Sequence, residues 1–171
     1  MNRSWPALGS LCPGEGCSGA ATEGDATQCP ESRSSGLKVG LATVKALLTP
    51  AALQRLDGSA YRFCSSPDCD VVYFDSAAGS VFNKRELRTR VGVKETEDPV
   101  PVCYCFAITL GDLRRDIETL GTTAVPAMIA AQVRAGHCAC EVRNPQGTCC
   151  LGNVSSAVKS IESKIRTTTS H

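Results

Sequence analysis

The residues of this chain best suited to chemistry are its cysteines, of which there are eleven among 171 residues. Six of them form three close pairs along the second half of the chain: Cys103 and Cys105, Cys138 and Cys140, and Cys149 and Cys150. Cysteines that are adjacent or one residue apart rarely bridge each other, because the disulfide is strained. Soft thiolates that face a common centre suit zinc or an iron–sulfur cluster. The spacing therefore favours a metal centre over disulfides or unconnected buried thiols.

A second group of cysteines precedes these pairs. Cys64 and Cys69 flank the turn-forming sequence Ser-Ser-Pro-Asp, and the segments on either side, YRFC and CDVVYF, consist largely of strand-forming residues. This arrangement is typical of a zinc knuckle, and the alternative is two half-buried thiols in a hairpin. Cys12, Cys17 and Cys29 lie in a Gly- and Ser-rich stretch with no helical or strand period, so we expect residues 1–28 to form a disordered tail.

Composition limits the classes of function. Hydrophobic residues make up 42% of the chain but aromatic residues only 5%, and small cores of this kind often need metals or disulfides. The net charge of +1 gives no overall electrostatic attraction for nucleic acid. No apolar run is long enough for a membrane span or a signal peptide. We therefore expect a cytoplasmic protein, in which cysteine pairs usually indicate metal or redox chemistry.

The elements that must position the cysteines can be predicted in part. Residues 37–48 are expected to form a short strand and a helical turn, and Thr49 to cap a helix that starts at Pro50 and reaches Asp57-Gly58. Residues 83–99 form a charged connector, and its basic run is typical of a solvated face: Lys84, Arg85, Arg88 and Arg90.

Three helices are predicted in the second half. Thr109 caps a helix that begins near Leu110 and ends at Gly121, and its apolar face consists of Leu113, Ile117 and Leu120. A second helix spans roughly residues 126–134. A tight loop over residues 144–147 precedes a third helix from Leu151, followed by a frayed end at 167–171. The apolar residues of the third helix recur at helical spacing: Val154, Val158, Ile161 and Ile165.

These motifs resemble those of known families. A C-x-C pair, two short helices and a second thiolate group resemble bacterioferritin-associated ferredoxin (BFD), in which a [2Fe–2S] cluster lies under a helical hairpin. The longer motifs TVKALL, YRFCSSPDCDVVYFD, FNKRELRTRVGVKE, PVCYCF and NPQGTCC resemble the amino-terminal domain of the CopZ copper chaperones. The resemblance extends from about Cys29 to Val154. It implies an α+β fold in which a small zinc-knuckle β module, residues 29–93, is followed by a helical, BFD-like [2Fe–2S] module, residues 94–166.

The resemblance also implies the cluster ligands, which are Cys103, Cys105, Cys140 and Cys150. Cys138 and Cys149 are then spare thiols near the site. A cluster of this kind takes four thiolates, so two of the six cysteines must be left out. Cys150 stands at the start of the last predicted helix, where backbone N–H groups and the positive end of the dipole favour an anionic cluster.

The zinc site departs from the family pattern. Cys29, Cys64 and Cys69 match family ligands, but Ser32 stands where the family's C-P-x-C motif has its second cysteine. A neutral hydroxyl is a poor zinc ligand compared with a thiolate. Either another group such as Cys17, Cys12 or Glu31 completes the site, or the site binds zinc weakly or not at all.

The sequence favours an iron–sulfur and zinc protein that carries one electron or reduces a metal ion in the homeostasis of copper or another soft metal. Its partners would be that metal ion and a metal-transport or redox protein. The chain has no M-x-C-x-x-C copper-transfer motif, so the copper-delivery step of the family is not implied. The alternatives are a thiol-rich module that sequesters soft metal ions through Cys138 and Cys149, and a protein whose metals only hold the fold. No acid–base pair or activated nucleophile is apparent, and His137 is interpreted as a surface residue, so a stand-alone enzyme is disfavoured.

Overall fold

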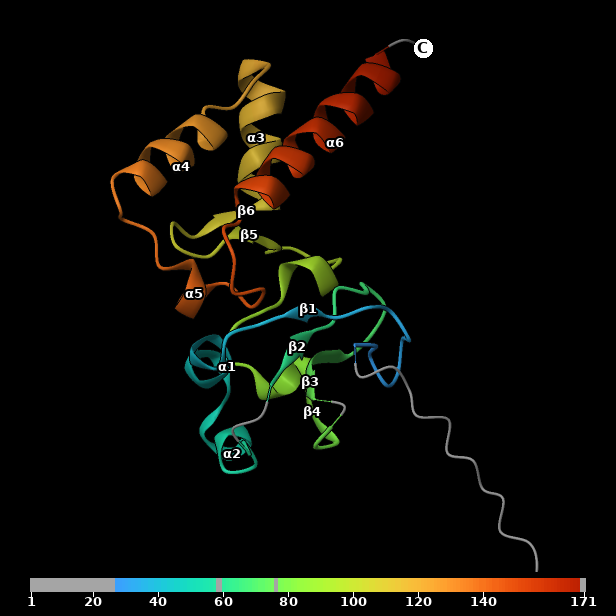
Figure 1. The fold of residues 1–171 in the computed structure, drawn as a ribbon. Helices are drawn as coiled ribbons and strands as arrows, with labels where there is room; N and C mark the ends of the chain where they lie inside the picture. The colour runs from blue at the N-terminus through green and yellow to red at the C-terminus, as the bar shows by residue number, and fades with distance from the viewer. Residues whose placement is uncertain (1–26, 58–59, 76, 170–171) are drawn as a thin grey trace, which may run out of the picture.

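The computed structural model describes residues 27–57, 60–75 and 77–169. The tail expected at residues 1–28, with Cys12 and Cys17, lies almost entirely outside the described residues. Figure 1 shows two halves: a sheet with two small helices, and a group of helices. The hairpin β5–β6 and the short helix α5 lie between the halves.

The first half is built on a four-stranded antiparallel sheet in the order β1-β2-β3-β4. Its strands are β1 (Leu37–Lys38), β2 (Arg62–Phe63), β3 (Val71–Asp75) and β4 (Ser80–Asn83). Every residue of β3 is buried, which agrees with its run of β-branched and aromatic side chains. The predicted strands on either side of the Ser-Ser-Pro-Asp turn are confirmed, and the turn between them carries Cys64 and Cys69.

Two helices cover this sheet. They are α1 (Leu41–Leu47) and α2 (Pro50–Leu53), and the Thr49 side chain accepts the backbone N–H of Ala52 as the predicted N-cap. The second helix ends well before Asp57. The backbone N–H groups of Arg55 and Leu56 bond to carbonyls three residues back, which tightens the chain into a turn after Leu53.

The charged connector is more ordered than its composition indicates. It contains two 3-10 turns, η1 (Lys84–Glu86) and η2 (Gly92–Lys94). Val91 is buried and Lys94 is only 4% exposed, so this segment packs against the sheet half. A short hairpin that was not predicted follows, formed by β5 (Pro101–Cys103) and β6 (Ile108–Thr109).

The second half contains α3 (Leu110–Leu120), α4 (Val125–Arg134), α5 (Cys140–Arg143) and α6 (Leu151–Thr169). The cap of α3 is confirmed: Thr109 and Asp112 form a capping box, and Gly121 ends the helix with a φ of 73°. Leu113 and Ile117 are buried as predicted. Leu120 is 71% exposed, because it is the last residue of α3 and the neighbouring helices do not cover it.

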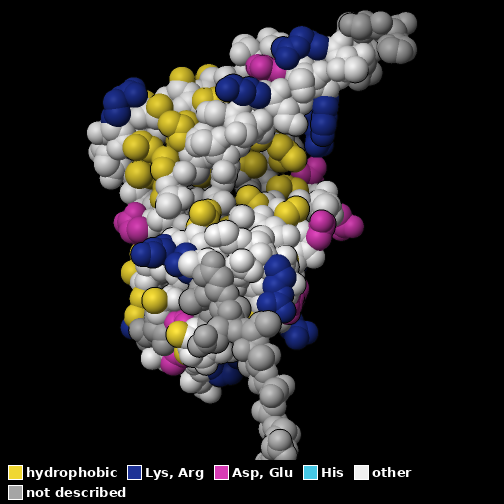
Figure 2. Space-filling model, turned by 45° about the vertical axis from the view of Figure 1, so that its right-hand side comes forward, with side chains coloured by type: hydrophobic (Ala, Val, Ile, Leu, Met, Phe, Trp, Pro, Cys, Tyr) yellow, Lys and Arg dark blue, Asp and Glu magenta, His cyan; other side chains and the backbone are white. Residues whose placement is uncertain are grey.

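The last helix is longer than predicted. It includes Thr167–Thr169, which the sequence analysis placed in a frayed end. Its residues Val154 and Ile161 belong to one apolar cluster with Leu113, Ile117 and Ile129. Figure 2 shows further hydrophobic side chains on the visible face of this helical half. None of the helices described here combines the length and the apolar character that crossing a bilayer requires.

Hydrogen bonds join the two halves. The Tyr73 hydroxyl on β3 donates to the carbonyl of Pro145 at 2.9 Å, and the Thr43 hydroxyl on α1 donates to the carbonyl of Glu141. Gly92 donates its N–H to the Tyr104 hydroxyl at 2.8 Å. A Cβ atom at Gly92 would lie 1.8 Å from the carbonyl oxygen of Pro101, so this close approach requires glycine. The loop before Cys150 is therefore held against the sheet half.

Candidate metal centres

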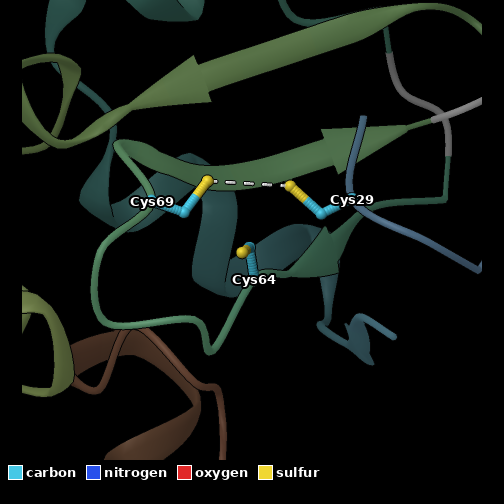
Figure 3. A group of neighbouring side chains, drawn as sticks. All are labelled: Cys29, Cys64 and Cys69. Atoms are coloured by element: carbon cyan, nitrogen blue, oxygen red, sulfur yellow. Dashed lines mark hydrogen bonds between the residues drawn. The ribbon is translucent and has the colours of Figure 1, made fainter. Parts of the chain in front are cut away.

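The first centre consists of three buried thiols. The Sγ atoms of Cys29, Cys64 and Cys69 all lie within 4.8 Å of one another, and those of Cys29 and Cys69 are 3.9 Å apart. Figure 3 shows the three side chains pointing toward a common point. Two zinc-bound thiolates in a tetrahedral site lie about 3.8 Å apart, given Zn–S bonds of about 2.3 Å. The three thiols therefore fit a zinc ion.

Two turns bring these thiols together. Cys64 follows β2 and Cys69 precedes β3, so the hairpin places both on one side of its turn. The third comes from a tight turn after Cys29, in which the N–H of Arg33 bonds to the carbonyl of Cys29 and the N–H of Cys29 bonds to the carbonyl of Ser34. Arg33 adopts a left-handed conformation with a φ of 60°. This turn directs Ser32 toward the thiols.

Hydroxyl groups surround the Cys64 thiol. The Oγ of Ser32 lies 3.4 Å from the Cys64 Sγ, and the Oγ of Ser34 lies 3.7 Å from it. Burial raises the pKa of Cys64, but hydrogen bonds from Ser32, the backbone of Ser66 and Ser34 outweigh it and lower the pKa to about 7. Ser34 was not singled out in the sequence, because a serine two residues from the expected ligand position has no distinctive pattern.

The Cys69 thiol differs in its surroundings. Burial raises its pKa to about 11, and the neighbouring thiols add to this effect. Such a thiol becomes a thiolate at neutral pH when a metal ion replaces its proton. The Oε2 atom of Glu31 lies 3.7 Å from the Cys69 Sγ.

A buried cation supports the turn that carries Cys69. The Lys94 ammonium donates to the carbonyls of Ser66 at 2.7 Å and Cys69 at 3.0 Å. Lys94 is not predictable from the sequence, because it lies in a charged connector, where lysine is ordinarily solvated. Only the tertiary contact between η2 and the hairpin turn distinguishes it from its neighbours.

The second centre gathers the four cysteines that the family resemblance implies. Cys103, Cys140 and Cys150 are buried and Cys105 is half-buried. The thiols of Cys105 and Cys140 form a pair 3.6 Å apart, and Cys103 is paired with Cys150 in that burial and the Cys103 thiol raise the pKa of Cys150. Among the residues that the structure describes, the trio of the first centre is the one group of three metal-binding side chains within 4.8 Å. No three of the four thiols of the second centre therefore all lie within that distance of one another.

Four short structural features position these thiols. Cys103 ends β5, and Cys105 lies in the turn that leads to β6. Cys140 begins α5, and Cys150 immediately precedes α6, where its carbonyl accepts the N–H of Val154. Each pair thus joins segments that are distant in the sequence, and each cysteine lies in a hairpin or at the start of a helix.

Backbone N–H groups point at two of the sulfur atoms. The N–H of Ala139 donates to the Cys105 Sγ at 3.3 Å, and the backbone of Cys150 donates to the Cys140 thiol. Burial raises the pKa of Cys140 to about 12 and raises that of Cys150 as well, and in each case the paired thiol adds to the effect. Metal binding would remove these protons, and the N–H donors would then stabilise the thiolates.

The remaining candidates lie outside these groups. Cys149 is exposed and Cys138 is half-buried, whereas their neighbours Cys150 and Cys140 are buried. The His137 ring hydrogen-bonds to the Gln132 side chain at 2.8 Å on the surface. Burial thus agrees with the preference for Cys140 and Cys150 within each pair, while ligation by the four thiols stays a prediction.

Comparisons with known proteins agree with the first centre. Residues 26–88 match the CopZ zinc-binding domain family. This segment contains the three-thiol site and the sheet that carries it.

The similarity extends beyond that segment. The copper chaperone CopZ of Archaeoglobus fulgidus is 36% identical over 148 residues, which cover 81% of this chain and 70% of the relative. The X-ray structure of the amino-terminal domain of that protein superimposes with a TM-score of 0.63 at 36% identity, covering 75% of this chain and 95% of the domain. The mixed fold, with an antiparallel sheet near the amino terminus, is therefore shared. The chain belongs to the CopZ family.

Proposed function

We propose that this chain binds zinc at Cys29, Cys64 and Cys69 and a [2Fe–2S] cluster at Cys103, Cys105, Cys140 and Cys150, and that it acts as a one-electron carrier or metal reductase in copper homeostasis. The observation that carries this proposal is the arrangement of the second centre. A single zinc ion requires all four ligands within about 4 Å of one another. Four neighbouring thiols of which no three lie within 4.8 Å of one another suit two metal ions, each with two terminal thiolates.

The residues of the chain supply what such a cluster needs. When bound, a [2Fe–2S] cluster takes up and releases one electron. Cys103 and Cys150 are at most 1% exposed and lie in the apolar cluster of α3, α4 and α6, which excludes water from that side. Cys105 is the most exposed of the four thiols, so electrons would enter and leave on its side. The N–H groups at Ala139 and Cys150 favour the anionic form of the centre.

The name of the relative supports copper as the metal that is handled. The Archaeoglobus protein is a copper chaperone. In our proposal, one electron from the reduced centre converts Cu(II) to Cu(I), and a redox partner protein restores the electron. Soft thiolate partners then accept Cu(I) in preference to Cu(II).

A stoichiometric titration tests this function. The protein is purified anaerobically, reduced with dithionite, freed of excess reductant and titrated with Cu(II). We expect one Cu(I) to form for each reduced cluster, measured with a chromophoric Cu(I) chelator, while the visible spectrum returns to the oxidised form. A reduced centre that is stable in the presence of Cu(II) would contradict the reductase proposal.

Sequestration is the second candidate, because the exposed Cys149 and the half-buried Cys138 lie within two residues of the proposed ligands Cys150 and Cys140 in the sequence. Tight, stoichiometric Cu(I) binding that disappears in the Cys138→Ala/Cys149→Ala double variant, with the cluster intact, would support it. Equal Cu(I) binding by the wild type and the double variant would leave electron transfer as the function.

A further inference from the structure

Cys29, Cys64 and Cys69 supply three ligands of the zinc centre, and the fourth ligand is still unassigned. Three thiolates do not complete a tetrahedral structural zinc site. Oxygen atoms of two kinds contact the thiols: the hydroxyls of Ser32 and Ser34 beside Cys64, and the carboxylate of Glu31 beside Cys69. Glu31 and Ser32 are consecutive, and both line an open pocket of about 280 Å³ together with Ser66, Asp68 and Cys69.

We propose that the carboxylate of Glu31 is the fourth zinc ligand, in place of the cysteine that Ser32 replaces. Zinc in proteins takes thiolate, imidazole and carboxylate ligands, and a neutral hydroxyl is not among its usual donors. A carboxylate is therefore the stronger of the two available groups. The inference concerns the zinc centre alone and does not depend on the cluster.

The geometry of the contact supports this assignment. A thiolate sulfur and a carboxylate oxygen bound to one tetrahedral zinc lie about 3.5 Å apart, for bonds of about 2.3 and 2.0 Å. The Oε2 of Glu31 and the Sγ of Cys69 are 3.7 Å apart. Without a metal, the Cys69 thiol donates its proton to this carboxylate. A zinc ion that replaces the proton would then have both atoms as ligands.

The Ser32 hydroxyl is engaged in hydrogen bonds with Ser34 and Cys64. Its hydroxyl contacts the Cys64 Sγ and lies 2.8 Å from the Ser34 Oγ, and it accepts the N–H of Ser34. These contacts make Ser32 part of a hydroxyl network that stabilises the Cys64 thiolate. Ser32 therefore contacts Cys64, whereas Glu31 contacts Cys69.

The charge of the site is compatible with a fourth anionic ligand. Three thiolates, a carboxylate and Zn²⁺ carry a net charge of −2. The buried ammonium of Lys94 is held at the carbonyl of Cys69 and offsets part of this charge. The Glu31 carboxylate does not lie within 4.8 Å of all three thiols, so it must turn to reach the metal, and the exposed position of its side chain on the rim of the pocket allows this turn.

Zinc K-edge X-ray absorption of the full-length protein tests the inference directly, because iron does not contribute at this edge. We expect three sulfur ligands and one oxygen ligand. In a competition titration with a chromophoric chelator, Glu31→Gln should weaken zinc binding by roughly tenfold or more, since even loss of an outer-shell partner has that effect. Asp68→Asn removes a carboxylate from the same pocket and serves as the control that should not change the affinity.

A rescue variant separates ligation from a general effect of charge. Glu31→Gln combined with Ser32→Cys should recover zinc affinity, because a thiolate then fills the fourth position. Four sulfur ligands in the wild type would overturn the inference and indicate Cys12 or Cys17. Equal affinities for Glu31→Gln and Asp68→Asn would overturn it as well, as would a wild-type chain that binds no zinc. Iron and sulfide content, measured on the same samples, reports on the proposed cluster separately.

Discussion

At the scale of single residues, a buried lysine holds the turn that carries Cys69. Lys94 is nearly fully buried, and its ammonium satisfies two carbonyls of the turn that carries Cys69. Buried carbonyls without a donor cost about 1–3 kcal/mol each. A buried charge in this position is therefore compatible with folding because it is hydrogen-bonded on the turn and close to anionic ligands.

Replacing Lys94 by methionine should lower both stability and zinc affinity. The methionine preserves the apolar stem but removes the ammonium donor of the Cys69 carbonyl, while the Ser66 carbonyl still accepts the N–H of Cys69, so the free energy of unfolding should fall by about 1–3 kcal/mol. Chemical denaturation of the zinc-loaded protein measures the change. Lys159→Met on the exposed surface of α6 is the matched control and should have almost no effect. Equal stability of the two variants would show that Lys94 is dispensable.

At the scale of elements, the helices with clear end signals were predictable, whereas the short elements between Pro101 and Arg143 that lack such signals were not. Thr109, Asp112 and Gly121 specify the ends of α3, and Thr49 with Pro50 specifies the start of α2. The hairpin β5–β6 and the helix α5 contain two to four residues per element, too few to establish a period. The pairing of cysteines across those elements depends on tertiary packing, and here only the family resemblance indicated which four gather.

The cap of α3 predicts a specific pH dependence. The Asp112 carboxylate accepts bonds from the hydroxyl and the backbone N–H of Thr109, and these lower its pKa. Because the pKa is lower in the folded state, this contribution to stability is fully present above the unfolded value of about 3.9 and is lost as the pH falls through the folded value. The Asp112→Asn variant should therefore have a lower free energy of unfolding than the wild type at neutral pH, and this difference should shrink below about pH 4. A difference that is constant with pH would contradict this role.

At the scale of the whole molecule, a core residue of the sheet half hydrogen-bonds to the loop of the proposed cluster site. Tyr73 belongs to the apolar core of the sheet half, yet its hydroxyl holds the carbonyl of Pro145, in the loop between Cys140 and Cys150. Burial raises the pKa of Tyr73 well above its ordinary value, so the hydroxyl remains a donor at every physiological pH. The sheet that carries the zinc centre thus also positions one side of the proposed cluster site.

Tyr73→Phe should therefore destabilise the proposed cluster more than it alters the sheet. The variant leaves the Pro145 carbonyl without its donor, and we expect iron to be extracted by a chelator several-fold faster than from the wild type. Tyr61→Phe is the matched control, because it removes a tyrosine hydroxyl from the same core, one that bonds to Asp57 and not to the cluster loop. Equal extraction rates for the two variants would mean that the halves are independent.

The measurement that tests the account most directly is the iron and sulfide content, with the EPR spectrum after dithionite reduction, of three anaerobically purified proteins. The wild type and Cys149→Ala should each contain two irons and two sulfides per chain and give the signal of one reduced [2Fe–2S] centre. Cys150→Ala should lack both the colour and the signal, since an all-cysteine site cannot spare a ligand. A cluster that survives loss of Cys150 but disappears with Cys149, or a wild type without sulfide, would contradict the account.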